Sequence, residues 1–102
     1  MRPPLPLAFA FLVFVLVAGE ADAKEPEWSY DTDDDVNSVA FSADGEYIAA
    51  VAEYSDKLFL FKKDNSTPLW SYDVGTSIYT VSISGNGEYI VVGNHLDEFF
   101  LF

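Results

Sequence analysis

Residues 26–31 read P-E-W-S-Y-D, and residues 68–73 read P-L-W-S-Y-D. A second motif follows each copy, because S-A-D-G-E-Y-I at residues 42–48 is matched by S-G-N-G-E-Y-I at residues 84–90. Both motifs recur at one offset of 42 residues. A period of about 40–45 residues is typical of proteins built from structural repeats. The identical residues at matching positions include Trp28 and Trp70, Tyr30 and Tyr72, Gly45 and Gly87, and Tyr47 and Tyr89.

The N-terminal region has the composition of a signal peptide. Arg2 precedes an apolar run over residues 7–18, and A-D-A at residues 21–23 is similar to the sites that signal peptidases cut. The apolar run is too short to span a bilayer as a helix, which takes about 20 residues. We therefore expect residues 1–23 to be a cleaved signal peptide, with an uncleaved N-terminal anchor as the alternative, and residues 24–102 to form one repeat domain.

The predicted mature chain is strongly acidic and contains no cysteine. Residues 24–102 carry four lysines and 15 Asp or Glu residues, which leaves a net charge of −11. This negative charge repels nucleic acids and anionic membranes, whose phosphates are bound by clustered Lys and Arg. Without cysteine, no disulfide can form and no lipid can be attached through a thiol. We expect a secreted or cell-surface protein, stabilised by packing, with no membrane contact beyond the signal segment.

The repeats are predicted to consist of β-strands. Helical periodicity is absent after the signal segment, and β-branched and aromatic residues dominate the apolar stretches. The pairs Asp44-Gly45 and Asn86-Gly87 accept the positive φ that a tight hairpin requires. Several stretches are apolar on both faces, which is typical of sheets covered on both sides. The predicted strands are residues 27–31, 36–42, 47–53, 57–62, 68–74, 78–84, 88–93 and 98–102.

The repeated motifs resemble the blades of a β-propeller. In WD-repeat-like propellers of secreted prokaryotic proteins, an outer strand of the P-L-W-S-Y type precedes a V-x-S-V-x-x-S-x-D-G-x-Y-I hairpin, to which residues 36–48 are similar. The motifs also resemble the tryptophan-bearing repeats of the quinoprotein superfamily, where a Trp on the outer strand docks one blade on the next. The Gly-His and Trp-Asp dipeptides of eukaryotic WD repeats are absent. The resemblance implies two four-stranded antiparallel blades of 42 residues each.

Two blades are fewer than the roughly four to eight that close a propeller. In closed propellers the N-terminal outer strand completes the last blade, and we expect residues 27–31 to do so here. The outer blade faces would still lack the neighbours that repeats need to bury them. We therefore expect either a partial propeller belonging to a longer chain or a ring of several copies, as in some two-blade lectins.

Candidates for a metal or catalytic site are few, and no cofactor is predicted. Asp31, Asp33 and Asp35, together with Asp34, are spaced as in a Ca²⁺-binding loop. The positions that such a loop gives to Gly and Glu hold other residues, which favours a solvated acidic loop. His95 is the only histidine, and the chain has no cysteine, so the usual ligands of a zinc site are missing. A single histidine with no orienting partner in the sequence also gives no support for a Ser-His-Asp triad.

Two further features could serve binding or modification. Asn65 begins an N-S-T glycosylation sequon in a predicted exposed turn, with an ordinary polar turn as the alternative. The recurring Trp and Tyr residues are predicted to pack between blades, because a ligand site seldom needs the same aromatic residues in every copy. A sugar-stacking or cofactor platform is the alternative interpretation.

These features favour an exported, non-catalytic β-propeller-type protein whose surface binds or scaffolds other molecules. Its expected partners are further blades or further copies of itself, an extracellular protein, or a glycan. One alternative is a piece of a quinoprotein dehydrogenase that uses pyrroloquinoline quinone through ligands outside this chain. The other is a two-blade lectin that assembles into a ring.

Overall fold

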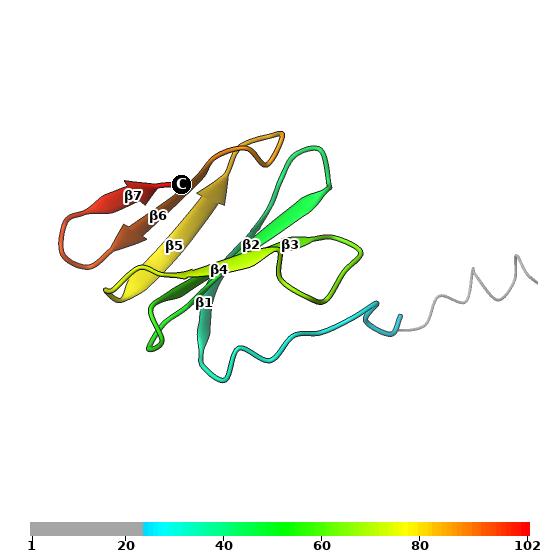
Figure 1. The fold of residues 1–102 in the computed structure, drawn as a ribbon, viewed down its shortest axis with the longest axis horizontal. Coiled ribbons are helices and arrows are strands. Elements are labelled where there is room, and N and C mark those ends of the chain that lie inside the picture. The colour runs from blue at the N-terminus through cyan, green and yellow to red at the C-terminus, as the bar shows by residue number, and fades with distance from the viewer. Residues whose placement is uncertain (1–23) are drawn as a thin grey trace, which may run out of the picture.

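The structure is a computed structural model that describes residues 24–102, so the predicted signal peptide lies outside the described part. The described residues form seven antiparallel strands in two sheets (Figure 1). The first sheet has the order β1-β2-β3-β4, and the second has the order β5-β6-β7. The all-β prediction is confirmed. The strands are β1 Val36–Phe41, β2 Tyr47–Ala52, β3 Lys57–Lys62, β4 Trp70–Asp73, β5 Ile78–Ile83, β6 Ile90–Asn94 and β7 Phe99–Leu101.

The repeated S-x-D/N-G-E-Y motif forms the same hairpin turn in both sheets. Gly45 and Gly87 each adopt a φ of 76°, a conformation that glycine accepts without the steric cost of a Cβ. In the β1–β2 turn, the Ser42 hydroxyl donates to the Asp44 carboxylate and accepts from the backbone N–H of Tyr47. The matching bonds of the β5–β6 turn are made by Ser84, Asn86 and Tyr89. The motif thus specifies its hairpin through local hydrogen bonds.

The main core lies where the two sheets face each other, with β1 and β2 packed against β5. Its buried side chains are Ala49, Val51, Leu58, Leu60, Ile78, Val81, Ile90 and Val92. Burying one Leu, Ile or Val side chain contributes about 1.5–3 kcal/mol. The opposite face of the first sheet holds a smaller cluster of Ala52, Phe59 and Phe61. We call the face in the main core the inner face of the first sheet, and the opposite one its outer face.

The P-L-W-S-Y-D motif supplies the fourth strand of the first sheet. β4 pairs with β3 so that Trp70 lies opposite Leu60 and Tyr72 lies opposite Leu58. Their rings reach across to the second sheet, where Trp70 and Tyr72 contact the ring of Phe102 at centroid distances of 6.3 and 5.1 Å. The outer strand of one sheet therefore also packs against the residue that follows the last strand of the next.

Two predictions about the first copy of this motif are wrong. Residues 27–31 are not a strand, because their backbone forms no ladder with another part of the described chain. They also do not complete the last blade, so the second sheet has three strands instead of the predicted four. The edge of β3 that could have accepted them is occupied by β4. Residues 27–31 instead run along the first sheet, held by the packing of Trp28 and Tyr30 against Phe61.

Candidate functional site

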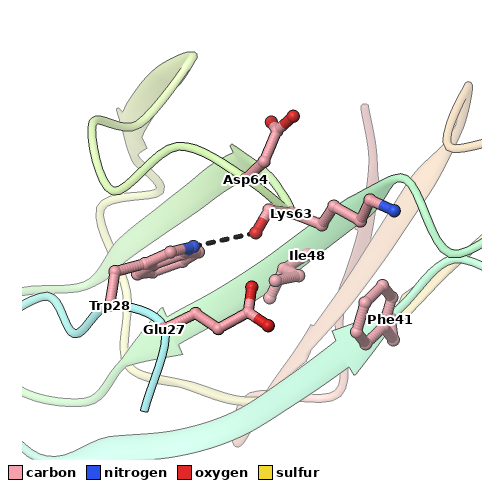
Figure 2. Close-up of a pocket in the computed structure, with 6 residues that line it drawn as sticks. All are labelled: Glu27, Trp28, Phe41, Ile48, Lys63 and Asp64. Carbon is pink, nitrogen blue, oxygen red and sulfur yellow. Dashed lines mark hydrogen bonds between the residues drawn. The ribbon is translucent and has the colours of Figure 1, made fainter. Parts of the chain in front are cut away.

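A groove of about 420 Å³ crosses the outer face of the first sheet beside Trp28 (Figure 2). The indole Nε1 of Trp28 donates a hydrogen bond of 2.8 Å to the backbone carbonyl of Lys63. Figure 2 shows the Trp28 ring at one end, Ile48 in the middle and Phe41 at the other end. This hydrogen bond ties the N-terminal segment to the turn after β3, so the groove has one fixed wall. Its lining residues are Glu27, Trp28, Phe41, Ile48, Lys63 and Asp64.

A second hollow of about 160 Å³ continues the outer face toward the start of β1. Its lining is mostly apolar and includes Tyr30, Val39 and Phe61 as well as residues shared with the groove. Trp28 and Tyr30 contact the ring of Phe61 at centroid distances of 5.3 and 5.1 Å. Val39 and Phe41, both on β1, remain largely exposed at 64 % and 58 %. The outer face is therefore an apolar surface only partly covered by the N-terminal segment.

Charged groups line the rim of the groove. Lys24 donates a hydrogen bond of 3.0 Å to Glu27, and this bond, with the lysine charge, lowers the pKa of the Glu27 carboxyl. Both side chains are well exposed, so their ion pair adds little stability. Lys63 and Asp64 provide a cation and an anion on the opposite wall. The groove thus combines an apolar floor with a rim of mixed charge.

Two of the acidic residues proposed as a cation loop, Asp31 and Asp34, accept hydrogen bonds from the backbone. Asp31 accepts a hydrogen bond from the backbone N–H of Asp33 at 2.8 Å, and Asp34 accepts one from that of Asp35 at 2.8 Å and another from that of Ser55. Partial desolvation raises the pKa of Asp34, but these hydrogen bonds together lower it below its usual value. Among residues 24–102, no three His, Cys, Asp or Glu side chains lie close enough to hold a metal ion.

The remaining predicted site residues are dispersed. His95 lies in the β6–β7 turn and meets the ring of Tyr79 edge-on. Asn65 lies in the exposed turn after β3, and its side chain accepts a hydrogen bond of 2.9 Å from the backbone N–H of Thr67. Trp70 is 37 % exposed beside Phe102. None of these residues lines the groove.

Sequence reasoning singled out Trp28 but missed the other groove residues. In the sequence, Phe41 is recognisable only as part of the predicted strand 36–42, and Lys63 lies between the predicted strands 57–62 and 68–74. A usable signal was present, since alternation places Val39 and Phe41 on one face of β1.

No helix in residues 24–102 has the length and apolar character needed to span a membrane.

Comparison with known proteins supports the fold. No protein-family model matches the chain, and no curated protein sequence matches it. Among solved structures, it is similar to the β-propeller domain of Cps50 (Swd1) from Myceliophteria thermophila, with a TM-score of 0.57 and 18 % identity. The match covers 65 % of this chain and 20 % of that one. The chain therefore has a β-propeller-like fold and spans a fifth of the propeller domain it matches.

Proposed function

We propose that this chain is an exported, non-catalytic β-propeller-type scaffold whose outer face binds a polypeptide. The observation that carries the proposal is the exposed apolar surface of β1 beside the Trp28 groove. A contiguous apolar surface of this kind with a polar rim is typical of protein–protein interaction sites. Trp28 and Phe41 provide the aromatic anchors that dominate binding energy at such sites.

The contacts of Trp28 favour a polypeptide over a glycan. Its indole N–H is committed to the carbonyl of Lys63, and its ring lies against Phe61. A sugar would have to share an aromatic ring that is already packed on the sheet, whereas Phe41 and Val39 offer apolar contact to an incoming side chain. The rim residues Glu27, Lys63 and Asp64 can pair with charges of either sign on a bound polypeptide.

Site-specific photo-crosslinking tests the binding role. A photoreactive phenylalanine analogue at Phe41 is introduced into the full chain in the cells that export it, and crosslinked products are identified by mass spectrometry. Tyr54 is the control position, because it is 73 % exposed and lies in the β2–β3 turn away from the groove. We expect a discrete crosslinked polypeptide from position 41 and none from position 54. Equal labelling at both positions, or no polypeptide at 41, contradicts the proposal.

Two further measurements test the remaining parts of the proposal. If the chain is exported and cleaved, the released form begins at Lys24, and its intact mass shows this directly. Recovery of only the full-length form from the cell interior would contradict export. Titration with a glycan panel should leave the tryptophan fluorescence unchanged, and a saturable response abolished by Trp28→Phe would favour the lectin alternative.

A further inference from the structure

Because the two sheets are repeats, the burial of each residue can be compared with that of its equivalent in the other sheet. On the inner face of the first sheet, Leu58 and Leu60 are buried against the second sheet, with exposures of 0 % and 6 %. The strand pairing of β6 with β7 places Phe99 and Leu101 at the equivalent positions of the second sheet. These two side chains are 70 % and 67 % exposed. The second sheet therefore exposes the surface that the first sheet buries.

The outer face of the first sheet shows the reverse: positions that are buried in the second sheet are exposed or only partly covered here. In the second sheet, Val81 and Ile90 are buried against the first sheet. Their equivalents in the first sheet, 42 residues earlier, are Val39 and Ile48, which belong to the outer face and line its hollows. The chain therefore carries both halves of its internal interface a second time, one at each end. The half on the second sheet is exposed at Phe99 and Leu101, and the half on the first sheet is exposed at Val39 and only partly covered by the N-terminal segment.

The hairpin turns repeat this relation. The ring of Tyr47 in the first sheet lies over Gly87 of the second, where a Cβ would overlap the ring. The equivalent of Tyr47 is Tyr89, which is exposed. The equivalent of Gly87 is Gly45, which has open space above it. A ring from another molecule could thus occupy at Gly45 the place that Tyr47 occupies at Gly87.

The strand edges complete the correspondence. Trp70 and Tyr72 pack on Phe102 while their backbone pairs with β3. Trp28 and Tyr30 pack on Phe61, the equivalent of Phe102, in the same way. Only the partner strand differs, since residues 28–31 form no ladder within the described chain. The side chains of residues 28–31 are therefore packed as those of β4 are, but their backbone has no partner strand within the described chain. A strand equivalent to β3, such as β7 of another copy, could pair with them.

We propose that a second copy of this chain docks its second sheet on the outer face of the first, head to tail. β7 of one copy then pairs with residues 28–31 of the next, in the register that β3 and β4 show within the chain. Leu101 lies opposite Trp28 of the next copy, and Phe99 lies opposite Tyr30. This contact joins two different surfaces, so it repeats from copy to copy and closes when the rotation permits a ring.

Charge at the end of this ladder modulates the association. Within the chain, Lys57 of β3 lies opposite Asp73 of β4. Between copies, the same register places Glu98 opposite Asp31, and like charges at directly opposed positions are destabilising. Each copy also carries a net charge of −11 over residues 24–102. The contact is therefore strengthened by added salt, which screens this repulsion, and by replacement of Glu98 with lysine.

Cysteine crosslinking tests the register. The chain has no cysteine, so a full-length Asp31→Cys chain mixed with a full-length Glu98→Cys chain can form a mixed disulfide only at the introduced positions. Opposed residues of antiparallel strands have Cα separations of about 4.5–5.5 Å, which a disulfide can bridge. We expect the mixed dimer to dominate. A mixture of Asp31→Cys with Asp64→Cys is the matched control, and equal dimer yields from both mixtures would overturn the register.

Sedimentation of the full chain across a concentration series tests the interface. Phe99→Asp should weaken association about 10- to 100-fold, the loss expected for one large buried apolar side chain. Tyr54→Asp, at an exposed position outside the interface, should leave it unchanged. Glu98→Lys should tighten it severalfold, consistent with the modest worth of a cross-strand charge pair. An oligomer insensitive to both Phe99→Asp and Glu98→Lys, or a monomer at every concentration that also gives no crosslink, would overturn the proposal.

This inference rests on the proposed binding role of the outer face, and the two can fail separately. If crosslinking from Phe41 captures another copy of this chain, both stand. If it captures a different polypeptide while the chain sediments as a monomer, the outer face is a binding surface and the second-copy proposal is overturned. If position 41 captures nothing, the binding role itself is contradicted.

Discussion

Comparing Gly87→Ala with Gly45→Ala separates two contributions to the free energy of unfolding. One is the cost of a Cβ in the turn conformation, and the other is the cost of a steric overlap between the two sheets. Both glycines have a φ of 76°, where a residue with a Cβ loses about 1–2 kcal/mol. At Gly45 the new Cβ meets open space, whereas at Gly87 it overlaps the ring of Tyr47. Overpacking of this kind costs a further 1–3 kcal/mol or so. We therefore expect losses of about 1–2 kcal/mol for Gly45→Ala and about 2–5 kcal/mol for Gly87→Ala.

The measurement is urea unfolding at low protein concentration, followed by tryptophan fluorescence. A domain of this size has a core that contributes only about 3–5 kcal/mol, so Gly87→Ala should leave a large unfolded fraction without urea. Tyr47→Ala in the Gly87→Ala background removes the overlap and should recover part of the loss, which a double-mutant cycle measures. Equal losses for the two glycine variants, or strict additivity with Tyr47→Ala, would refute the packing of the two sheets through this turn.

Four further substitutions test the packing of the sheets and the hairpin turn. Leu58→Ala should cost about 2–5 kcal/mol in urea unfolding because Leu58 is fully buried. Phe99→Ala should cost under about 0.5 kcal/mol in the dilute monomer, and equal losses for both would contradict the assignment of buried and exposed faces. Trp70→Ala should cost about 1–2 kcal/mol because the ring is partly exposed, and a loss above about 4 kcal/mol would mean it is buried. Hydrogen bonds from Ser42 and from the Glu46 backbone N–H lower the pKa of Asp44. Its stabilising effect is therefore complete above the unfolded-state pKa of about 4 and is lost as the pH falls through the lower folded-state pKa. Asp44→Asn should weaken this acid dependence, and an unchanged pH profile of unfolding would show that these bonds are absent.

The hairpins could be predicted from the sequence because their determinants are local. Ser42, Asp44 and Gly45 lie within four residues, and the turn they form depends on hydrogen bonds among themselves and the adjacent backbone. The same bonds recur in the second copy, where Asn86 replaces Asp44. A motif that satisfies its own polar groups needs no information from the rest of the fold.

The fate of the two W-S-Y-D segments could not be predicted in the same way. The segments share their sequence, yet only residues 70–73 form a strand. A strand requires a neighbour, and β4 finds one at the edge of β3. Residues 28–31 instead pack on Phe61 of the outer face and pair with no strand of the described chain, although the edge of β7 is free. The groove cannot be predicted for a related reason, since Phe41 and Lys63 line one groove with Trp28 only because of the path of the N-terminal segment across the sheet.

The solution mass of the full chain, measured by light scattering across a concentration series, tests most directly the claim that the two exposed faces are complementary. We expect a rise from the mass of one chain to a discrete multiple at moderate salt, with two to four copies giving the roughly four to eight blades of a closed ring. Phe99→Asp should shift this rise to a concentration about 10- to 100-fold higher. A single-chain mass at every concentration and salt level, unaffected by Phe99→Asp, would contradict the claim.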